Sequence, residues 1–275
     1  MNKTDAKPFE MLSDEQTSVV KTIEVHISNV DLVTCSDWIN QQMLMLRSDS
    51  KALSQQRFFP DYIHNAGLNS ADIKHIITQF YCQFPELSPE DTLAVTEYVL
   101  AHAQYTEHQL IAFGLINKYV KRHYDDGLFF RFEYWLCNYA NNWAHVDDLC
   151  IKTTYQFFLS RPHFIPKVSR WAHSDVNWCR RASNVALVKF IKRKMGKSVY
   201  YLDPNLILSQ CLQLRDDSDE MVQKSIGWLL KVTSVHHPQA VITYLTEQHQ
   251  YIPRTTFRYA IEKFDTATKQ QLMAL

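Results

Sequence analysis

The sequence predicts an all-α fold: a right-handed solenoid of antiparallel helix pairs with a concave binding face. Only five Gly and nine Pro occur in 275 residues, which leaves little room for a turn-rich β architecture. Apolar residues recur at helical spacing, and helix-starting signals follow one another at short intervals. No segment has the pattern of a strand run, and the strand-like residues of Ser198–Leu202 fall in an expected loop.

We expect residues 1–57 to form an N-terminal helical extension. Its first 12 residues are polar, and Ser13 with Gln16 has the pattern of a capping box, which predicts a helix start. The extension continues with a helix over 37–47 and a loop or weak helix over 48–56.

Residues 58–275 are expected to form one continuous solenoid that begins with the aromatic-rich segment Phe58–Ile63. Ser88-Pro89 is a strong start signal, because Ser caps a helix and Pro suits its first turn. Antiparallel helix pairs of roughly 35–45 residues resemble HEAT-type units. Other helices are expected from Asn69 or Ser70, from Thr106 with Gln109 as a capping box, over 128–140, 143–160, 163–172 and 174–194, from Asp203-Pro204 to about Leu214, from Asp217 or Ser218 to about Thr233, from His237-Pro238, from Pro253 to Phe264, and near the end of the chain.

Composition and motifs exclude several classes of protein. No apolar run reaches the ~18 residues of a membrane span, and the N-terminus lacks an apolar signal core, so we expect a cytoplasmic protein with no membrane partner. The sequence has no HExxH, zinc-ligand spacing, GxGxxG or GxxxxGK[ST] pattern, which predicts neither a metal site nor a cofactor. The cysteines form no CxxC and are expected to be reduced thiols: Cys35, Cys82, Cys137, Cys150, Cys179 and Cys211.

Charge is divided unevenly along a chain whose formal net charge is +0. Residues 1–150 carry 11 Lys and Arg against 20 Asp and Glu, a net −9, and residues 151–275 carry 18 against 9, a net +9. Such a split can mark a nucleic-acid surface on the basic half, or it can reflect ordinary solvated faces. The charge pattern alone leaves both interpretations open.

The residues most suited to chemistry gather around Trp143 and Asp147. These two are four residues apart, so a helix places the indole and the carboxylate on one face, with Val146 and Leu149 toward the core. Asp147 could act electrostatically or as a base that positions a water, or it could be an ordinary surface acid. Trp143 and Trp228 could stack on a flat or cationic ligand, at about 0.5–2 kcal/mol per indole, or they could pack in the core.

Basic residues follow on the C-terminal side of this centre. Arg181 could bind a phosphate with its fork of N–H donors, whereas the adjacent Arg180 is expected to be a solvated helix residue. A basic run on the expected helix and its exit would suit contacts to a nucleic-acid backbone: Lys189, Lys192, Arg193, Lys194 and Lys197.

Three blocks of the C-terminal half carry a resemblance. They are Trp143-x-x-Val146-Asp147, Trp178-x-x-Arg181-Ala182 and, most specifically, Val222-Gln223-Lys224-Ser225-Ile226-Gly227-Trp228-Leu229-Leu230. They are similar to the motifs Trp-x-x-Val-Asp, Trp-x-x-Arg-Ala and Ile-Gln-Lys-Ala-Ile-Gly-Trp-x-Leu of the DNA alkylation repair family, the AlkD-type HEAT-like-repeat DNA glycosylases. The resemblance covers roughly residues 58–265, and Gly196–Tyr201 looks like an insertion between site helices.

The resemblance implies an enzyme that hydrolyses the N-glycosidic bond of cationic N3- or N7-alkylated purines in double-stranded DNA. By motif position, Asp147 would be the catalytic carboxylate, Trp143 and Trp228 would line the lesion, and Arg181 would bind DNA backbone. The family resemblance also implies an open cleft rather than a closed base pocket, and a curved monomer would suffice. The full set of expected DNA contacts is Arg181, Lys189, Lys192, Arg193, Lys224, Lys231 and Arg258.

Two other functions remain open at this point. The family resembles relatives that keep the fold, bind distorted DNA and lack excision activity, and helical-repeat stacks also serve as protein-interaction scaffolds. We favour the glycosylase because Trp143, Asp147, Arg181 and Trp228 are all present.

Overall fold

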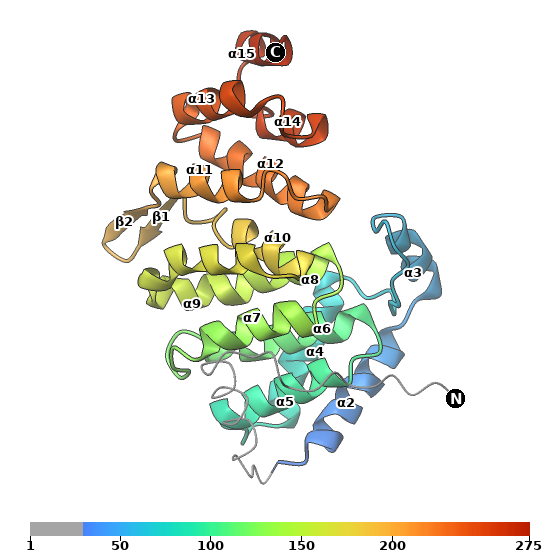
Figure 1. The fold of residues 1–275 in the computed structure, drawn as a ribbon. Coiled ribbons are helices and arrows are strands. Elements are labelled where there is room, and N and C mark those ends of the chain that lie inside the picture. The colour runs from blue at the N-terminus through green and yellow to red at the C-terminus, as the bar shows by residue number, and fades with distance from the viewer. Residues whose placement is uncertain (1–29) are drawn as a thin grey trace.

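The computed structural model describes residues 30–275, so the helix expected from Ser13 lies outside the described part. Helices stack along one long axis in the order of the chain, with α15 at the C-terminal end (Figure 1). The all-α helical-repeat prediction is confirmed, because helices dominate the described residues and the strands among them form one two-stranded sheet. None of the described helices has the length and apolar character that crossing a bilayer requires.

The helices form two layers, and the inner layer carries the candidate site. Successive inner helices pack on one another: α4 on α6, α6 on α8, α8 on α10, α10 on α12 and α12 on α14. The inner layer consists of α4 (Ser70–Gln83), α6 (Thr106–Leu115), α8 (Trp143–Asp148) with its continuations η2 (Leu149–Thr154) and α9 (Tyr155–Ser160), α10 (Asn177–Val185), α12 (Glu220–Ser234) and α14 (Arg254–Ala260). The outer layer consists of α2 (Leu32–Leu46), α5 (Pro89–Ala101), α7 (Leu128–Asn138), the 3-10 helix η3 (Pro162–His173), α11 (Pro204–Gln213), α13 (Pro238–Gln248) and α15 (Thr266–Met273). The short helices α3 (Asp49–Gln56) and η1 (Ile116–Lys118) complete the description.

A continuous hydrophobic core holds the two layers together. Val146 and Leu149 are fully buried in it, as their spacing predicted. Large aromatic side chains fill the space between the layers, and each contributes about 1.5–3 kcal/mol by leaving water. The expected helix over 143–160 is continuous, but its middle, η2, is π-helical.

Capping chemistry explains most helix starts. Asn69 caps α4 and Ser88 caps α5, each in a reciprocal box with the residue three positions later, which confirms both predictions. The predicted cap at Thr106 is wrong. Tyr105 occupies that position, because the Thr106 hydroxyl instead contacts His145 Nε2 at 2.7 Å and accepts from Asn142 Nδ2 at 2.8 Å.

The helix predicted over 174–194 is confirmed only over 177–185, and the expectation of no strand run is wrong. Helix α10 ends at Val185, and β1 (Lys192–Met195) then pairs antiparallel with β2 (Ser198–Tyr201). Gly196, with φ +62°, is the first residue of the two-residue turn, where a positive φ matches strand twist. Tyr200 packs edge-on against buried Phe190 and anchors the hairpin, which projects from the side of the stack (Figure 1).

The N-terminal helices differ from expectation in their bounds. Helix α2 starts at Leu32, capped by Asp31, five residues before the expected start. The segment 48–56 contains a helix, α3, which Ser48 caps. Helix α2 packs on α4 and α5, and the division of the chain at residue 57 stays a prediction.

Candidate active site

A cleft of about 330 Å³ opens on the inner layer between α8, α10, α12 and α14. It brings together the four residues that the sequence motifs had singled out: Trp143, Asp147, Arg181 and Trp228. The other lining residues are Phe58, Met221, Lys224 and Tyr259. Sequence analysis missed Phe58, Met221 and Tyr259, although the aromatic-rich segment that begins at Phe58 was visible.

The start of α8 positions both Trp143 and Asp147. Asn142 caps the helix by accepting from the backbone N–H of Ala144 at 2.9 Å and of His145 at 3.2 Å. Trp143 is therefore the first helical residue, and Asp147 follows one turn later on the same face. Both side chains are partly buried, so each keeps some surface on the cleft.

Asp147 forms a close ion pair with Arg181. The guanidinium Nε and Nη2 atoms donate to the same carboxylate oxygen, Oδ1, at 3.2 and 2.8 Å. Arg181 Nη1 donates to the carbonyl oxygen of Met221 at 2.6 Å, and the residue is only 5% exposed. Arg181 thus faces the carboxylate instead of presenting an open fork to a phosphate. Within residues 30–275 no group donates a hydrogen bond to Asp147 Oδ2.

Two opposing effects act on the pKa of Asp147. Burial, the larger effect, raises it above the ordinary value of 3.8 by disfavouring the charged carboxylate, and Asp148 adds to the rise. The charge and hydrogen bonds of Arg181 lower it. Asp148 is held separately in an ion pair with Lys152, one turn along the helix.

His145 fixes the start of α8 to α6. It is completely buried, and Nε2 lies 2.9 Å from the carbonyl oxygen of Thr106, while Nδ1 lies 3.4 Å from the backbone N of Asn141. Burial lowers the pKa of His145 to about 4, so the ring is neutral. In a neutral ring, Nε2–H can donate to the carbonyl oxygen of Thr106 while Nδ1 accepts from the backbone N–H of Asn141.

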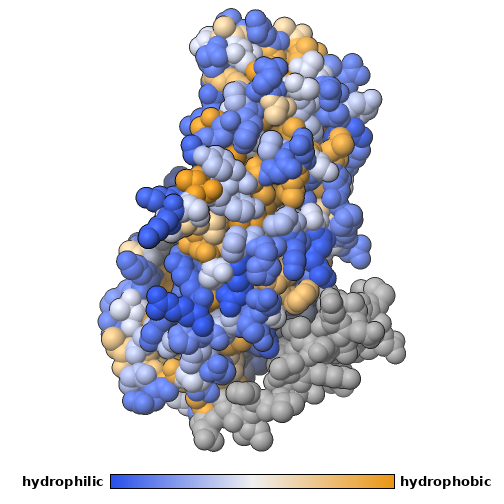
Figure 2. Space-filling model, turned by 90° about the vertical axis from the view of Figure 1, so that its left-hand side faces the viewer, coloured by the Kyte–Doolittle hydropathy of each residue, from blue (hydrophilic) through white to orange (hydrophobic). Residues whose placement is uncertain are grey.

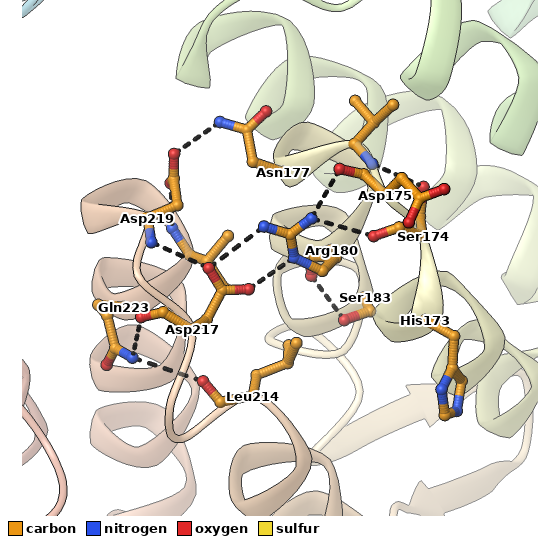
Figure 3. Close-up of polar contacts among 12 residues, drawn as sticks. His173, Ser174, Asp175, Asn177, Arg180, Ser183, Leu214, Asp217, Asp219 and Gln223 are labelled. Carbon is orange, nitrogen blue, oxygen red and sulfur yellow. Dashed lines mark hydrogen bonds and ion pairs between the residues drawn. The ribbon is translucent and has the colours of Figure 1, made fainter.

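A second polar network holds α10 against the start of α12 (Figure 3). The expectation that Arg180 is solvated is wrong: Nε donates to Asp217 Oδ2 at 2.6 Å and Nη2 donates to Oδ1 at 3.2 Å, with both side chains largely buried. Asn177 donates to Asp219, the cap of α12, at 2.7 Å. Asp217 pairs with Arg180, and Asp219 caps α12 instead, one or two residues later than the expected start at Asp217 or Ser218. The network sets the distance between the helices that carry Arg181 and Trp228.

The remaining expected DNA-contact residues lie in four places. Lys224 lines the cleft and pairs with Glu220 at 2.8 Å, while Arg258 is exposed on α14. Lys192 and Lys231 line a groove of about 240 Å³ with an apolar floor. Lys189 and Arg193 both lie over the ring of Tyr155, at 4.7 and 5.0 Å from its centroid.

The cleft and the groove lie along one face of α12. Lys224, Trp228 and Lys231 are spaced four and three residues apart, which places them in line on that face. Figure 2 views the side of the molecule from which the hairpin projects and shows hydrophobic surface exposed at mid-height among hydrophilic stretches.

The residues of the described range include no group of three His, Cys, Asp or Glu side chains placed to hold a metal ion.

Residues 39–264 match the family model described as "DNA alkylation repair enzyme". The chain belongs to this family. The resemblance inferred from the three sequence blocks is thereby confirmed. No curated protein matches the sequence.

Solved structures share the fold at low identity. A protein described as a "predicted DNA alkylation repair enzyme" from Enterococcus faecalis is 17% identical, with a TM-score of 0.66 over 80% of this chain and 97% of its own. The smu.31 protein of Streptococcus mutans is 19% identical, with a TM-score of 0.51 over 70% and 98%. The alkylpurine DNA glycosylase AlkC of Pseudomonas fluorescens, solved on DNA containing an abasic-site analogue, is 18% identical, with a TM-score of 0.52 over 88% of this chain and 65% of its own.

Proposed function

We propose that this member of the DNA alkylation repair family excises cationic N3- or N7-alkylated purines from double-stranded DNA by hydrolysing the N-glycosidic bond. One observation carries the proposal: the carboxylate of Asp147 shares an open cleft with the indoles of Trp143 and Trp228. Arg181 fixes one carboxylate oxygen, which leaves the other for a water or for the sugar.

The chemistry suits a site that has a carboxylate and no partner acid. An alkylated purine already carries a positive charge, so the electron pair of the breaking C1′–N bond neutralises it and it leaves without a proton. The sugar becomes an oxocarbenium-like cation, which the Asp147 carboxylate stabilises electrostatically. Water then adds its oxygen to C1′, and Asp147 accepts the proton that the water loses. The indole faces attract the cationic base before it leaves.

Binding to duplex DNA is supported by charge and by a structural neighbour. The basic residues of α12 and of the hairpin lie on or beside the surface that contains the cleft. AlkC, which shares the fold, was solved with DNA. Lys192, Lys224, Lys231 and Arg258 are therefore proposed backbone contacts, as are Lys189 and Arg193 beside Tyr155. For Arg181 the geometry favours a positioning role toward Asp147.

The deciding experiment compares Asp147→Asn with Asp148→Asn on methylated duplex DNA. Release of 3-methyladenine and 7-methylguanine is measured in single turnovers, and duplex affinity is measured in parallel. Asp147→Asn should lower release roughly 100-fold or more, the usual scale for losing a group that stabilises transition-state charge. It should keep duplex affinity within about twofold, since Asp147 is not a cationic contact.

Asp148→Asn is the matched control, because it removes the adjacent carboxylate, which is paired with Lys152 and does not line the cleft. Its release rate should equal that of the wild type. Equal release by Asp147→Asn would remove Asp147 from the mechanism. Duplex binding with no release by the wild type would identify a non-excising DNA-binding relative.

A further inference from the structure

The loop between α3 and α4 supplies one wall of the cleft. Phe58, the second residue after α3, lines the cleft together with Arg181 and Trp228, and 63% of the residue is exposed. A ring with most of its surface exposed gains little from burial, so its place beside two indoles calls for an explanation other than folding. In Figure 1 this loop follows α3, which stands beside the stack.

The loop is held at several points and has a defined position. Gln56 spans it, since its Nε2 donates to the carbonyl oxygen of Asp61 at 2.8 Å and its Oε1 accepts from the backbone N–H of Ile63 at 3.0 Å. The buried carboxylate of Glu107 accepts from the backbone N–H groups of Ala66 and Leu68. These bonds tie the loop to α3 and α6, so Phe58 is presented on a fixed support.

The same loop orients Trp143. The ring of Phe59 stacks on the indole with centroids 5.1 Å apart and planes at 19°, and Trp143 Nε1 donates to the carbonyl oxygen of Phe58 at 3.2 Å. Phe59 does not line the cleft, whereas Trp143 does. Phe59 therefore covers one face of the indole, and Trp143 meets the cleft with the surface that Phe59 leaves free.

We propose that Phe58 is a third aromatic contact for the nucleobase bound in the cleft, and that Phe59 is the residue that positions Trp143 for it. The proposal rests on the proposed function and adds a part of the site that lies 89 residues before Asp147 in the sequence. A planar purine would meet aromatic surfaces from α8, from α12 and from the loop. The N-terminal part of the chain thereby completes a centre whose other members all follow residue 142.

The test for Phe58 uses the full chain with the variants Phe58→Ala and Phe58→Tyr. Phe58→Ala should lower single-turnover base release from methylated duplex by roughly 5- to 100-fold, the scale of losing one aromatic contact to a base. Phe58→Tyr keeps a ring and should stay within about twofold of the wild type. Leu53→Ala is the control, since Leu53 is 78% exposed on α3 and lines none of the cleft.

Thermal unfolding separates this role from a structural one. All three variants should unfold with the wild type within about 2 °C, because the altered side chains are exposed. If Phe58→Ala releases base at the wild-type rate, the contact is refuted while the glycosylase function stands. If the wild type releases no base, the proposed function fails, and binding decides instead. The ratio of the affinities for methylated and unmethylated duplex is then compared: a lower ratio in Phe58→Ala than in the wild type supports the contact with the base, and an equal ratio overturns it.

The positioning role of Phe59 has its own readout. Phe59→Ala should redshift the emission of Trp143, obtained as the difference between spectra with and without Trp143→Phe, because water reaches the uncovered face. It should also lower kcat more than it raises KM, since the indole is misaligned at the reacting step. Phe59→Tyr should restore both properties. An unshifted Trp143 spectrum with an unchanged kcat in Phe59→Ala would overturn this role.

Discussion

The ion pair of Asp147 and Arg181 shows how little a motif says about a side chain's partner. The sequence motifs indicated both residues, but we expected Arg181 to bind a phosphate of the substrate. The structure buries the guanidinium and uses three of its N–H groups inside the protein. Removing one member of such a pair leaves the other buried without its partner, so the two residues act as a unit.

Replacing Arg181 should change the pH dependence of base release. Burial raises the pKa of Asp147 and Arg181 opposes that rise, so Arg181→Ala should raise it further. A carboxylate with a higher pKa is protonated sooner as the pH falls, so the acid limb of the rate profile should move to higher pH. Arg181→Lys keeps a positive charge and should fall between the two. The measurement is single-turnover release from pH 5 to 8, and an acid limb that stays in place would show that Arg181 does not tune Asp147.

At the scale of the element, local signals predicted much of what the structure contains. Reciprocal capping boxes at Asn69 and Ser88 and the Pro that follows Ser88 need only residues within one turn, so sequence was sufficient there. The cap at Thr106 failed because the hydroxyl bonds to His145, a partner 39 residues away. Long-range partners of this kind leave no local pattern.

Neither the hairpin nor the place of Phe58 in the cleft could be predicted from the sequence, for related reasons. The basic run from Lys192 has no apolar alternation, so it gave no strand signal, and the hairpin depends on Gly196 and on packing of Tyr200 against Phe190. The role of Phe58 depends on how the α3–α4 loop lies against α8, which is a tertiary contact. Cleft residues within helical motifs could be predicted, whereas those supplied by a distant loop could not.

The buried contact that His145 makes between α6 and α8 should be sensitive to acid. The pKa of His145 is about 4 in the folded protein against 6.5 for an ordinary histidine, because the ring is buried. The unfolded chain therefore takes up a proton first as the pH falls below 6.5, and stability decreases until about pH 4. Between pH 7.5 and pH 5 this should remove about 2 kcal/mol from the free energy of unfolding.

Urea unfolding at the two pH values tests this role of His145. His145→Gln should be less stable at pH 7.5 but should lose about 2 kcal/mol less than the wild type on acidification. His75→Gln, which alters an exposed histidine on α4, should behave as the wild type does. Equal acid losses in wild type and His145→Gln would contradict the assignment.

At the scale of the whole molecule, the proposed DNA contacts extend beyond the cleft to the hairpin. If Lys192 contacts a phosphate, Lys192→Gln should weaken duplex binding and flatten the plot of log affinity against log salt by about 0.9. Lys167→Gln is the control, because Lys167 is an exposed cation on the outer helix η3. Binding is measured between 50 and 200 mM salt, roughly the range over which phosphate contacts dominate. A slope that Lys192→Gln leaves unchanged would restrict DNA to the cleft itself.

Because the helices stack in chain order, position along the sequence is also position along the long axis of the molecule. The described residues 30–150 carry 8 basic and 15 acidic side chains, a net −7, and residues 151–275 carry a net +9. A charge division that is only a statistic in the sequence thus becomes an electric dipole lying lengthwise in the fold. Near any polyanion, such a dipole turns the molecule before contact, so the end with α10 to α14 arrives first and the acidic end trails behind.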